Sequence, residues 1–240
     1  MIINKVYHLA DLHIRNLQRH KEYRLVFKKF LKQVKEDNIE DSLIYIAGDI
    51  AHAKTEMSPE LVHEISWFLT ECAKLRETVL ITGNHDCNLN NSHRLDVLTP
   101  IIQNLGNDRI HYLRDTGVYN IHNLTFVVYS ILDNKENWPK GNTIDGENTI
   151  CLFHGPVNKA QTDIGYTVSS NSFQVDMFDG FDMAMLGDIH KRQTFGEGYE
   201  HIAYAGSMVQ QNHGELLENH GYLLWDIPTR TFTEHHIHNE

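Results

Sequence analysis

The sequence predicts an α/β protein with a layered sheet core, and three observations lead to this fold class. In the first part of the chain, strand-length apolar runs alternate with helix-length amphipathic segments, as they do around an α/β sheet. Later apolar runs are short and mostly strand-like. With 240 residues, 41% of them hydrophobic, the chain can bury a sizeable core, and we expect one domain covering residues 1–240.

Helices are expected between the early strands, and the second of them is the best defined. Ser58 can cap its N-terminus, and Pro59 suits the first turn because its missing N–H would be unpaired there anyway. Glu60 and Glu64 follow, where carboxylates interact favourably with the positive end of the helix dipole. The expected helices cover Tyr23–Asp37, Pro59–Arg76 and His93–Leu105.

The expected strands are short apolar runs bounded by turn-forming residues. In chain order they cover Lys5–Ala10, Leu43–Ala47, Thr78–Thr82, Thr125–Ile131, Thr149–Phe153, Met183–Leu186, Ile202–Tyr204, Tyr222–Ile227 and Thr231–Ile237. The stretch Asp133–Asn148 is polar and rich in Gly, Asn and Lys, which indicates a loop.

Composition narrows the class of protein. The net charge of −11 argues against a free-standing nucleic-acid binder. No apolar run reaches the roughly 18 residues of a membrane span, so we expect no membrane association. Cys72, Cys87 and Cys151 are an odd number and widely spaced. We therefore expect free thiols and a cytoplasmic protein.

Positive charge is concentrated in one segment. Residues 14–35 contain eight Lys and Arg residues and one acid, so this segment carries +7 and the other residues carry −18. Phe27, Phe30, Leu31 and Val34 fall at helical spacing, which leaves most of the lysines on the opposite face. This face is either a solvated helix surface or a surface that faces phosphate groups.

Clusters of Asp, Asn and His follow five of the expected strands. They read Asp11-Leu12-His13, Gly48-Asp49-Ile50-Ala51-His52, Gly83-Asn84-His85-Asp86, His154-Gly155 and Gly187-Asp188-Ile189-His190. In open α/β sheets the carboxyl ends of parallel strands meet at one crevice, so we expect these clusters to converge. The competing interpretation is a set of unrelated strand-end turns, where Asp, Asn and Gly are common. Five clusters in order make that interpretation the weaker one.

Converging carboxylates imply bound cations. Two carboxylates about 4 Å apart repel by roughly 4 kcal/mol at an effective dielectric constant near 20. Asp11, Asp49 and Asp188 would therefore need cations between them, or protons held at raised pKa values. A ligand set of Asp, Asn and His without Cys suits ions such as Mn, Fe or Zn.

These motifs, in this order, resemble the calcineurin-like metallophosphoesterase superfamily. D-x-H, G-D, G-N-H-D, a lone His and a G-x-x-H element carry the resemblance. His52, Tyr204-Ala205-Gly206-Ser207, Glu215 and the Gly221–Trp225 segment are closer to SbcD-type nuclease subunits of double-strand-break repair complexes, which also have phage counterparts. The resemblance implies a four-layer α-β-β-α sandwich with two packed mixed sheets and a metal site at the carboxyl ends of the strands. For a phage-encoded version, the compartment would be the host cytoplasm.

The resemblance implies two divalent metal ions that share Asp49. One ion would be held by Asp11, His13, Asp49 and His190, and the other by Asp49, Asn84, His154 and Asp188. Such a pair activates a water molecule and clamps the phosphoryl oxygens during hydrolysis. We expect Mn²⁺, with Fe²⁺, Mg²⁺ and Zn²⁺ as alternatives.

Three further residues receive catalytic roles by the same resemblance. His85 would act as general acid or transition-state stabiliser. His52 would orient the phosphate or an unwound DNA end, and Asp86 would orient His85. Positive charge follows two ligand motifs directly, and we expect DNA phosphate contacts from Arg15, Arg19, Lys191 and Arg192.

Asp188 departs from the pattern of the superfamily, which usually has G-H-x-H at this motif. Two divalent ions against Asp11, Asp49 and Asp188 leave a formal charge of +1, whereas a His at position 188 would leave +2. We keep Asp188 as a ligand and expect it to favour Mn²⁺ over Zn²⁺.

The function expected from these features is a metal-dependent DNA exo- or endonuclease. It would be the nuclease subunit of an ATPase-coupled complex, with DNA and an SbcC-type ATPase as partners. A homodimer is also expected. The apolar stripe of Leu95, Leu98, Ile101, Ile102 and Leu105 is either core or, as the resemblance implies, a dimer face. The chain ends at Glu240, so the DNA-capping and ATPase-binding segments usual in that group are expected to be absent.

Other functions remain open. The chain could be a nucleotide or small-molecule phosphodiesterase of the same superfamily, or a catalytically silent binding scaffold. A protein Ser/Thr phosphatase is disfavoured, because those enzymes carry G-D-x-V-D-R-G and G-N-H-E, whereas this chain has Ala51-His52 and Asp86.

Overall fold

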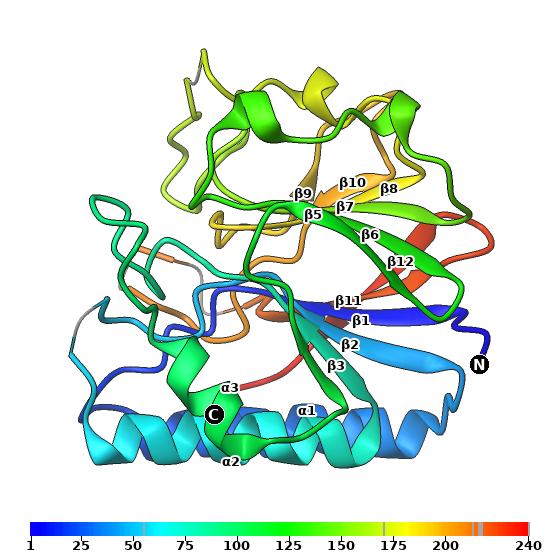
Figure 1. Cartoon of the computed structure of the whole chain (residues 1–240). Coiled ribbons are helices and arrows are strands. Elements are labelled where there is room, and N and C mark those ends of the chain that lie inside the picture. The colour runs from blue at the N-terminus through cyan, green and yellow to red at the C-terminus, as the bar shows by residue number, and fades with distance from the viewer. Residues whose placement is uncertain (55, 170, 213, 216–217, 240) are drawn as a thin grey trace.

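Two mixed six-stranded β-sheets pack face to face at the centre of the molecule (Figure 1). The computed structural model describes residues 1–54, 56–169, 171–212, 214–215 and 218–239. One hydrophobic cluster, with Tyr45, Phe126 and Trp225 among its fully buried members, fills the space between the sheets. The expected α/β fold with two packed mixed sheets is therefore confirmed.

The first sheet has the order β12-β11-β1-β2-β3-β4. The four strands β1 to β4 are parallel to one another, whereas β11 and β12 are antiparallel additions at the β1 edge. The strands are β1 (Lys5–Leu9), β2 (Ser42–Ile46), β3 (Glu77–Leu80), β4 (Ile110–Tyr112), β11 (Gly221–Asp226) and β12 (Thr231–His236). Because β1, β2 and β3 run in one direction, the motifs that follow them emerge on the same side.

The second sheet has the order β5-β6-β7-β8-β10-β9. Its four central strands are parallel, and β5 and β9 are antiparallel edges. The strands are β5 (Gly117–Ile121), β6 (Leu124–Tyr129), β7 (Thr149–His154), β8 (Met183–Gly187), β9 (Gln193–Thr194) and β10 (Ile202–Tyr204). The sequence did not predict β4, β5 and β9.

Helices cover the outer face of the first sheet (Figure 1). They are α1 (His20–Asp37), α2 (Pro59–Leu75) and α3 (Leu98–Leu105). The outer face of the second sheet is covered by loops with short 3₁₀ turns, namely η1 (Lys135–Asn137), η2 (Gly141–Thr143) and η3 (Val175–Phe178). Two of these turns lie in the segment expected to be a loop.

The ends of the helices follow the local hydrogen bonds. The Ser58 hydroxyl accepts a hydrogen bond from the Leu61 backbone N–H at 3.1 Å, which is the predicted cap of α2. The third helix begins later than His93, because the Asp96 carboxylate accepts hydrogen bonds from Thr99 and fixes the chain in a turn there. The third helix is therefore shorter than predicted.

The apolar stripe near α3 packs mostly into the core. Leu98 and Ile101 are buried, and Ile102 and Leu105 pack against the same cluster. Leu95 is 74% exposed and lies before the helix. The stripe therefore has a core role, and the homodimer stays a prediction.

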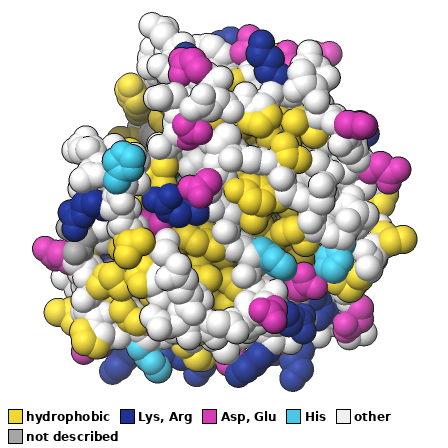
Figure 2. Space-filling model, viewed as in Figure 1, with side chains coloured by type: hydrophobic (Ala, Val, Ile, Leu, Met, Phe, Trp, Pro, Cys, Tyr) yellow, Lys and Arg dark blue, Asp and Glu magenta, His cyan; other side chains and the backbone are white. Residues whose placement is uncertain are grey.

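The lysine-rich face of α1 is a solvated surface. Phe27, Phe30 and Val34 point into the core, whereas Lys28 and Lys32 are exposed. Figure 2 shows dark-blue side chains gathered along the lower face of the molecule, where α1 lies in Figure 1. This face points away from the sheets. In the part of the chain that is described, no helix has the length and apolar character needed to cross a membrane.

Candidate metal centre

Seven side chains from both sheets converge at the carboxyl ends of their strands. The loops after β1, β2 and β3 bring side chains from the first sheet, and the end of β7 and the loop after β8 bring the others. These side chains belong to Asp11, His13, Asp49, Asn84, His154, Asp188 and His190. They are the residues predicted as metal ligands from the sequence, and the structure places them together.

The backbone at this meeting point is strained. Asp11, His13 and Asp49 have φ values of 53°, 45° and 52°, and Asp188 has a φ of 96°. Residues other than glycine rarely adopt positive φ, at a cost of roughly 1–3 kcal/mol each, and such strain is typical of functional sites. The left-handed conformations turn the loops back toward the space between the two sheets.

The first group of donor atoms comes from Asp11, His13 and His190. These atoms lie within 4.8 Å of one another, and the Nε2 atoms of His13 and His190 are 3.1 Å apart. Asp49 joins them through Oδ2, which lies 3.4 Å from His13 Nε2. Two imidazole nitrogens and two carboxylates around one point form a donor set suited to a divalent ion.

The second group surrounds His154 Nε2. Three oxygen atoms lie near this nitrogen: Asn84 Oδ1 at 3.2 Å, Asp49 Oδ1 at 3.4 Å and Asp188 Oδ1 at 3.7 Å. His154 Nδ1 lies 2.6 Å from the Ala47 carbonyl oxygen, to which it donates a hydrogen bond. That bond leaves the Nε2 lone pair available to a cation, and it orients the ring as outer partners of metal-bound histidines do.

Glycines allow the loops to approach this closely. A Cβ atom on Gly83 would collide with the backbone and carboxylate of Asp49. A Cβ atom on Gly187 would collide with the Ala47 carbonyl oxygen, which joins the two sheets at this point. Both positions therefore require glycine for contact between backbones.

Burial and mutual charge shift the pKa values of the acids and histidines in the two ligand groups. Burial raises the pKa of Asp11 to about 7, and the Asp49 and Asp188 carboxylates add to the rise. Burial alone would lower the pKa of His190, but the hydrogen bond to Glu215 and the charge of Asp11 outweigh it and raise the pKa to about 9. His154 is likewise buried, yet the Asp49 carboxylate raises its pKa.

Metal affinity is expected to rise steeply with pH up to about pH 9. An ion can bind only when Asp11, His154 and His190 have lost their protons, and their raised pKa values, about 7 for Asp11 and about 9 for His190, make that loss costly below this pH. Each displaced proton contributes about tenfold in apparent affinity per pH unit. Calorimetric titration of EDTA-treated protein with Mn²⁺ over a series of pH values measures this pH dependence of the metal affinity. An affinity independent of pH would show that the ion binds elsewhere.

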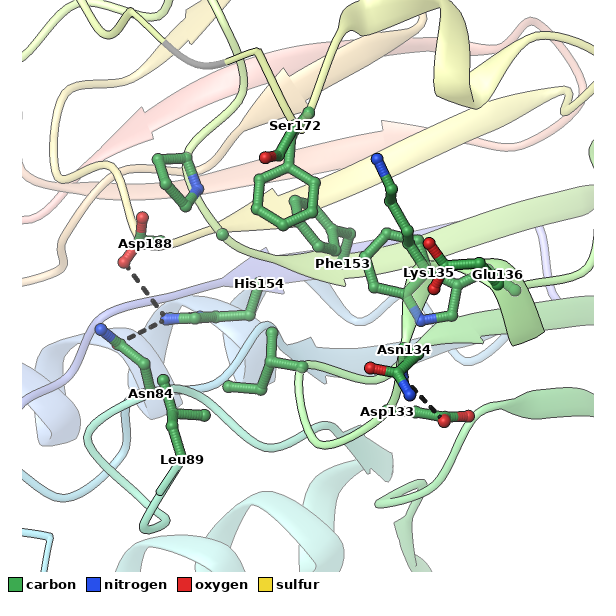
Figure 3. Close-up of a pocket in the computed structure, with 15 residues that line it drawn as sticks. Asn84, Leu89, Asp133, Asn134, Lys135, Glu136, Phe153, His154, Ser172 and Asp188 are labelled. Carbon is green, nitrogen blue, oxygen red and sulfur yellow. Dashed lines mark hydrogen bonds and ion pairs between the residues drawn. The ribbon is translucent and has the colours of Figure 1, made fainter. Parts of the chain in front are cut away.

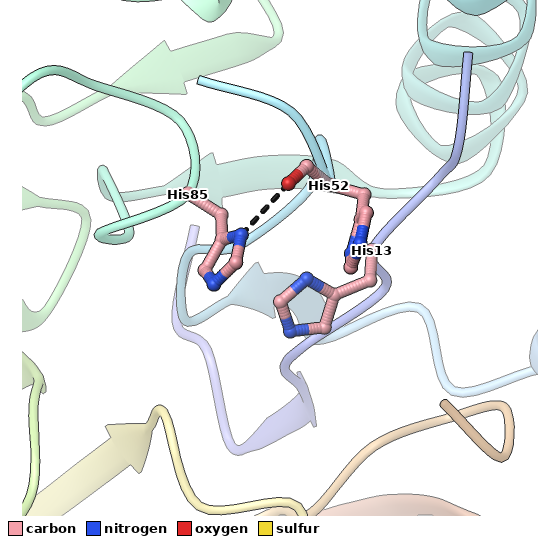
Figure 4. Close-up of side chains that lie close together, drawn as sticks. All are labelled: His13, His52 and His85. Atoms are coloured by element: carbon pink, nitrogen blue, oxygen red, sulfur yellow. Dashed lines mark hydrogen bonds between the residues drawn. The ribbon is translucent and has the colours of Figure 1, made fainter. Parts of the chain in front are cut away.

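A third group consists of His13, His52 and His85 (Figure 4). The rings of His13 and His85 are edge to face with their centroids 4.8 Å apart, and those of His52 and His85 are stacked at 5.4 Å. The His85 backbone N–H donates a hydrogen bond to Asp49 Oδ1 at 2.7 Å, so His85 is held beside the shared ligand. The donor atoms of this group also meet the spacing of a metal site.

Asp86 was predicted to orient the His85 ring. The structure corrects this prediction, because Asp86 and the His85 ring have different hydrogen-bond partners. The Asp86 carboxylate is fully buried and accepts hydrogen bonds from the backbone N–H groups of Ala51 and Gly83, at 2.8 and 2.9 Å. His85 Nδ1 lies instead 2.7 Å from the backbone carbonyl oxygen of His52. Asp86 therefore fixes the loops after β2 and β3, and the backbone of His52 orients the ring.

Glu215 is a site residue that received no role from the sequence. Its carboxylate is 6% exposed and lies 2.7 Å from His190 Nδ1. It also accepts hydrogen bonds from the backbone of Gln211 and the side chain of Asn212. A carboxylate behind a ligand histidine fixes the ring and its tautomer. The sequence carries no spacing signal for this contact, because Glu215 lies 25 positions beyond His190.

The predicted DNA contacts lie in different environments. Arg15 lines a cavity together with His52, whereas Lys191 lines a different cavity with its Nζ 3.1 Å from Gln161 Oε1. Arg19 is paired with Glu22 at 2.6 Å. The prediction for Arg192 is wrong: its side chain is 6% exposed, donates hydrogen bonds to the backbone of Ala205 and His235, and contacts Glu234.

Comparisons with known proteins agree with this fold and site. The sequence profile of the calcineurin-like phosphoesterase family matches residues 4–192 of this chain. All seven converging residues lie within this range. An uncharacterized protein of Acanthamoeba polyphaga mimivirus is 42% identical over 238 residues, which are 94% of this chain but only 17% of that protein.

Two solved structures have a similar fold. The protein TT1561 of Thermus thermophilus has a TM-score of 0.56 at 11% identity, with 98% of this chain and 99% of that one covered. A protein described as a novel archaeal phosphodiesterase has a TM-score of 0.50 at 11% identity, with 96% and 98% covered. At this identity the likeness concerns the fold alone.

The fold and the grouped acids and histidines are those of the metallophosphoesterase class of proteins. The chain belongs to the family of calcineurin-like phosphoesterases.

Proposed function

We propose that this chain is a DNA nuclease that hydrolyses phosphodiester bonds, as the nuclease subunit of an ATPase-coupled repair or recombination complex. The observation that supports it most is the group of His13, His52 and His85 beside the shared ligand Asp49. Protein phosphatases have Asp-Arg-Gly where this chain has His52-Ala53-Lys54. The SbcC-type ATPase and the homodimer belong to this proposal. A nucleotide or small-molecule phosphodiesterase is the second candidate, favoured by the net charge of −11.

The residues present fit two divalent ions, for which Mn²⁺ is our proposal. When bound, the ions supply a Lewis acid that polarises the phosphate and activates water. Asp11, His13, Asp49 and His190 would hold one, and Asp49, Asn84, His154 and Asp188 the other. His85 Nδ1–H donates to the His52 carbonyl oxygen, which leaves Nε2 as the atom that would give a proton to the leaving oxygen. His52 contributes this carbonyl, and its side chain, which lines the cavity with Arg15, would orient the phosphate.

The function is tested with linear double-stranded DNA and a generic phosphodiester in parallel, both with Mn²⁺. We expect both to be hydrolysed, and we expect EDTA to stop both reactions. An Asp49→Asn variant purified in the same way controls for contaminating nucleases. Hydrolysis of the generic phosphodiester without any cleavage of DNA would favour the small-molecule phosphodiesterase instead.

Arg15→Ala is expected to raise KM for DNA by about tenfold, the effect of losing one charge-assisted phosphate contact. One guanidinium nitrogen donates to the Gln211 carbonyl oxygen at 3.0 Å, whereas Nε is buried and has no partner among the described residues. KM for the generic phosphodiester should stay unchanged. Lys32→Ala, on the exposed face of α1, is the matched control and should change neither value.

Asp188→His is expected to shift metal preference from Mn²⁺ toward Zn²⁺ and to lower the pH at which the rate rises. The substitution removes one negative charge from the second group of ligands, so the bound ions are neutralised less. Asp188 Oδ1 is near enough to His154 for this effect, at 3.7 Å from Nε2. Rates with each metal over a pH series measure both shifts. A variant that matches the parent in both would remove Asp188 from the ligand set.

A further inference from the structure

An aromatic pocket opens directly beside the metal centre (Figure 3). Its volume is about 420 Å³, within the usual range of small-molecule sites, roughly 300–1,000 Å³. At one end it is lined by Asn84, His154 and Asp188, which all belong to the second group of ligands. The pocket is therefore continuous with the place where a phosphate would be hydrolysed.

Three aromatic rings form the wall farther from the ligands. Trp138 and Phe173 are stacked with their centroids 5.9 Å apart, and Phe153 meets Trp138 edge to face at 5.5 Å. The indole N–H of Trp138 donates to the Ser130 carbonyl oxygen at 3.2 Å, which fixes its position. Leu89 faces them across the pocket and is 48% exposed. The wall is preformed, rigid and apolar.

The rim of this pocket is polar but does not attract anions. Lys135 stands there with Asp133 and Glu136, so carboxylates outnumber cations. A second phosphate would be repelled here, whereas a neutral group with hydrogen-bonding edges would be accepted. Asn134 and Ser172 also line the rim and can bind such edges.

A second cavity lies beside the ligand groups. Arg15, His52 and Glu56 line it, and the His52 ring is 5.3 Å from the ring of the ligand His13. The ligand groups thus border a polar cavity that contains an arginine as well as the aromatic pocket. A substrate that carries a phosphate on one side of the scissile bond and a planar neutral group on the other matches this arrangement.

We propose that the aromatic pocket holds the unpaired base of the nucleotide next to the scissile phosphate. Apolar aromatic walls with polar rims are how proteins bind single-stranded bases without reading sequence. A base can enter only when it is unstacked from its neighbours, so the pocket favours frayed or single-stranded DNA over the interior of a duplex. This inference rests on the proposed function and names the substrate form that the site takes.

Dinucleotides with and without a base test this proposal. We expect kcat/KM for a thymidine dinucleotide to fall roughly tenfold or more when one particular nucleoside is replaced by an abasic tetrahydrofuran, and little when the other is replaced. Phe173→Ala should lower the rate on the intact dinucleotide and leave the rate on the sensitive abasic one unchanged. Leu89→Ala should act in the same direction, whereas Leu95→Ala, which removes an exposed leucine outside the pocket, is the matched control.

Binding of deoxyadenosine monophosphate gives a readout that does not depend on cleavage. We expect it to quench the fluorescence of Trp138, and the quenching to disappear in Trp138→Phe, which keeps Trp67 and Trp225. Equal cleavage of intact and both abasic dinucleotides, or quenching that persists in Trp138→Phe, overturns the pocket proposal while the nuclease proposal stands. If the parent protein cleaves no DNA but deoxyadenosine monophosphate still quenches Trp138, the nuclease proposal is overturned and the base-binding role of the pocket stands.

Discussion

Asp49→Asn is expected to lower the rate of hydrolysis by on the order of 10⁴-fold or more, the largest effect of any single change in the molecule. Asp49 is the residue shared by both ligand groups, with one carboxylate oxygen 3.4 Å from His13 Nε2 and the other 3.4 Å from His154 Nε2. It also accepts the hydrogen bond from the His85 backbone N–H. An amide removes the charge that both ions would share, so metal binding should weaken at both groups together.

The metal-free Asp49→Asn protein should melt below the metal-free parent. Burial alone would raise the pKa of Asp49, but the charge and hydrogen bond of His154 outweigh burial and lower it, so the Asp49 charge stabilises the folded metal-free protein although it also raises the pKa values of Asp11 and Asp86. Activity should therefore be compared at a temperature well below the melting point of the variant. Kinetic assays, calorimetric titration with Mn²⁺ and thermal melts measure the three quantities, and Asp108→Asn at an exposed position is the control. Activity within tenfold of the parent would refute the shared-ligand role.

His85→Gln is expected to lower kcat by about 10²–10⁴-fold and to leave metal binding unchanged. The side chain would lose the proton that it donates to the leaving oxygen, while glutamine retains much of the volume. Because the His85 backbone N–H still reaches Asp49, the ligand groups should keep their geometry. His93→Gln, at an exposed position, controls for the general effect of removing an imidazole.

The stoichiometry of metal binding separates two roles for His85. The donor atoms of His13, His52 and His85 also lie within the spacing of a metal site. A fall in the number of ions bound to His85→Gln would identify this residue as a ligand and contradict its role as a proton donor. An unchanged number with a large loss of kcat supports the proton donor.

The sequence predicted the site better than its surroundings. Parallel strands bring their carboxyl ends to one edge, so the polar residues after β1, β2, β3, β7 and β8 could be grouped from chain order alone. Short edge strands such as β4 and β9 have few residues and little apolar pattern, so nothing local predicted them. The shortened third helix depended on one side-chain contact made by Asp96.

Predictions about Arg192 and Asp86, which lie outside the ligand groups, were less accurate than those about the ligands themselves. Arg192 follows a ligand motif directly, but strand pairing at the sheet edge turns it into the interior beside Ala205. Asp86 follows His85 directly, yet its carboxylate turns toward two backbone N–H groups. Neighbours in sequence after a turn point in different directions, and only the tertiary structure decides which groups they meet. Trp138 belongs to a segment whose polar composition hid its place in an aromatic pocket.

The close approach of Gly187 to Ala47 joins the two sheets at the end of the sandwich that carries the ligands. Asp49 from the first sheet and His154 from the second meet there, so an ion bound to both would cross-link the two sheets at the ligand end. At the opposite end, the Asn123 side chain ties the sheets through hydrogen bonds with the Ile3 backbone, which need no ion. Without the ion, hydrogen bonds from His154 Nδ1 to the Ala47 carbonyl oxygen and from the Asp188 backbone N–H to Asp11 would still join the sheets at the ligand end.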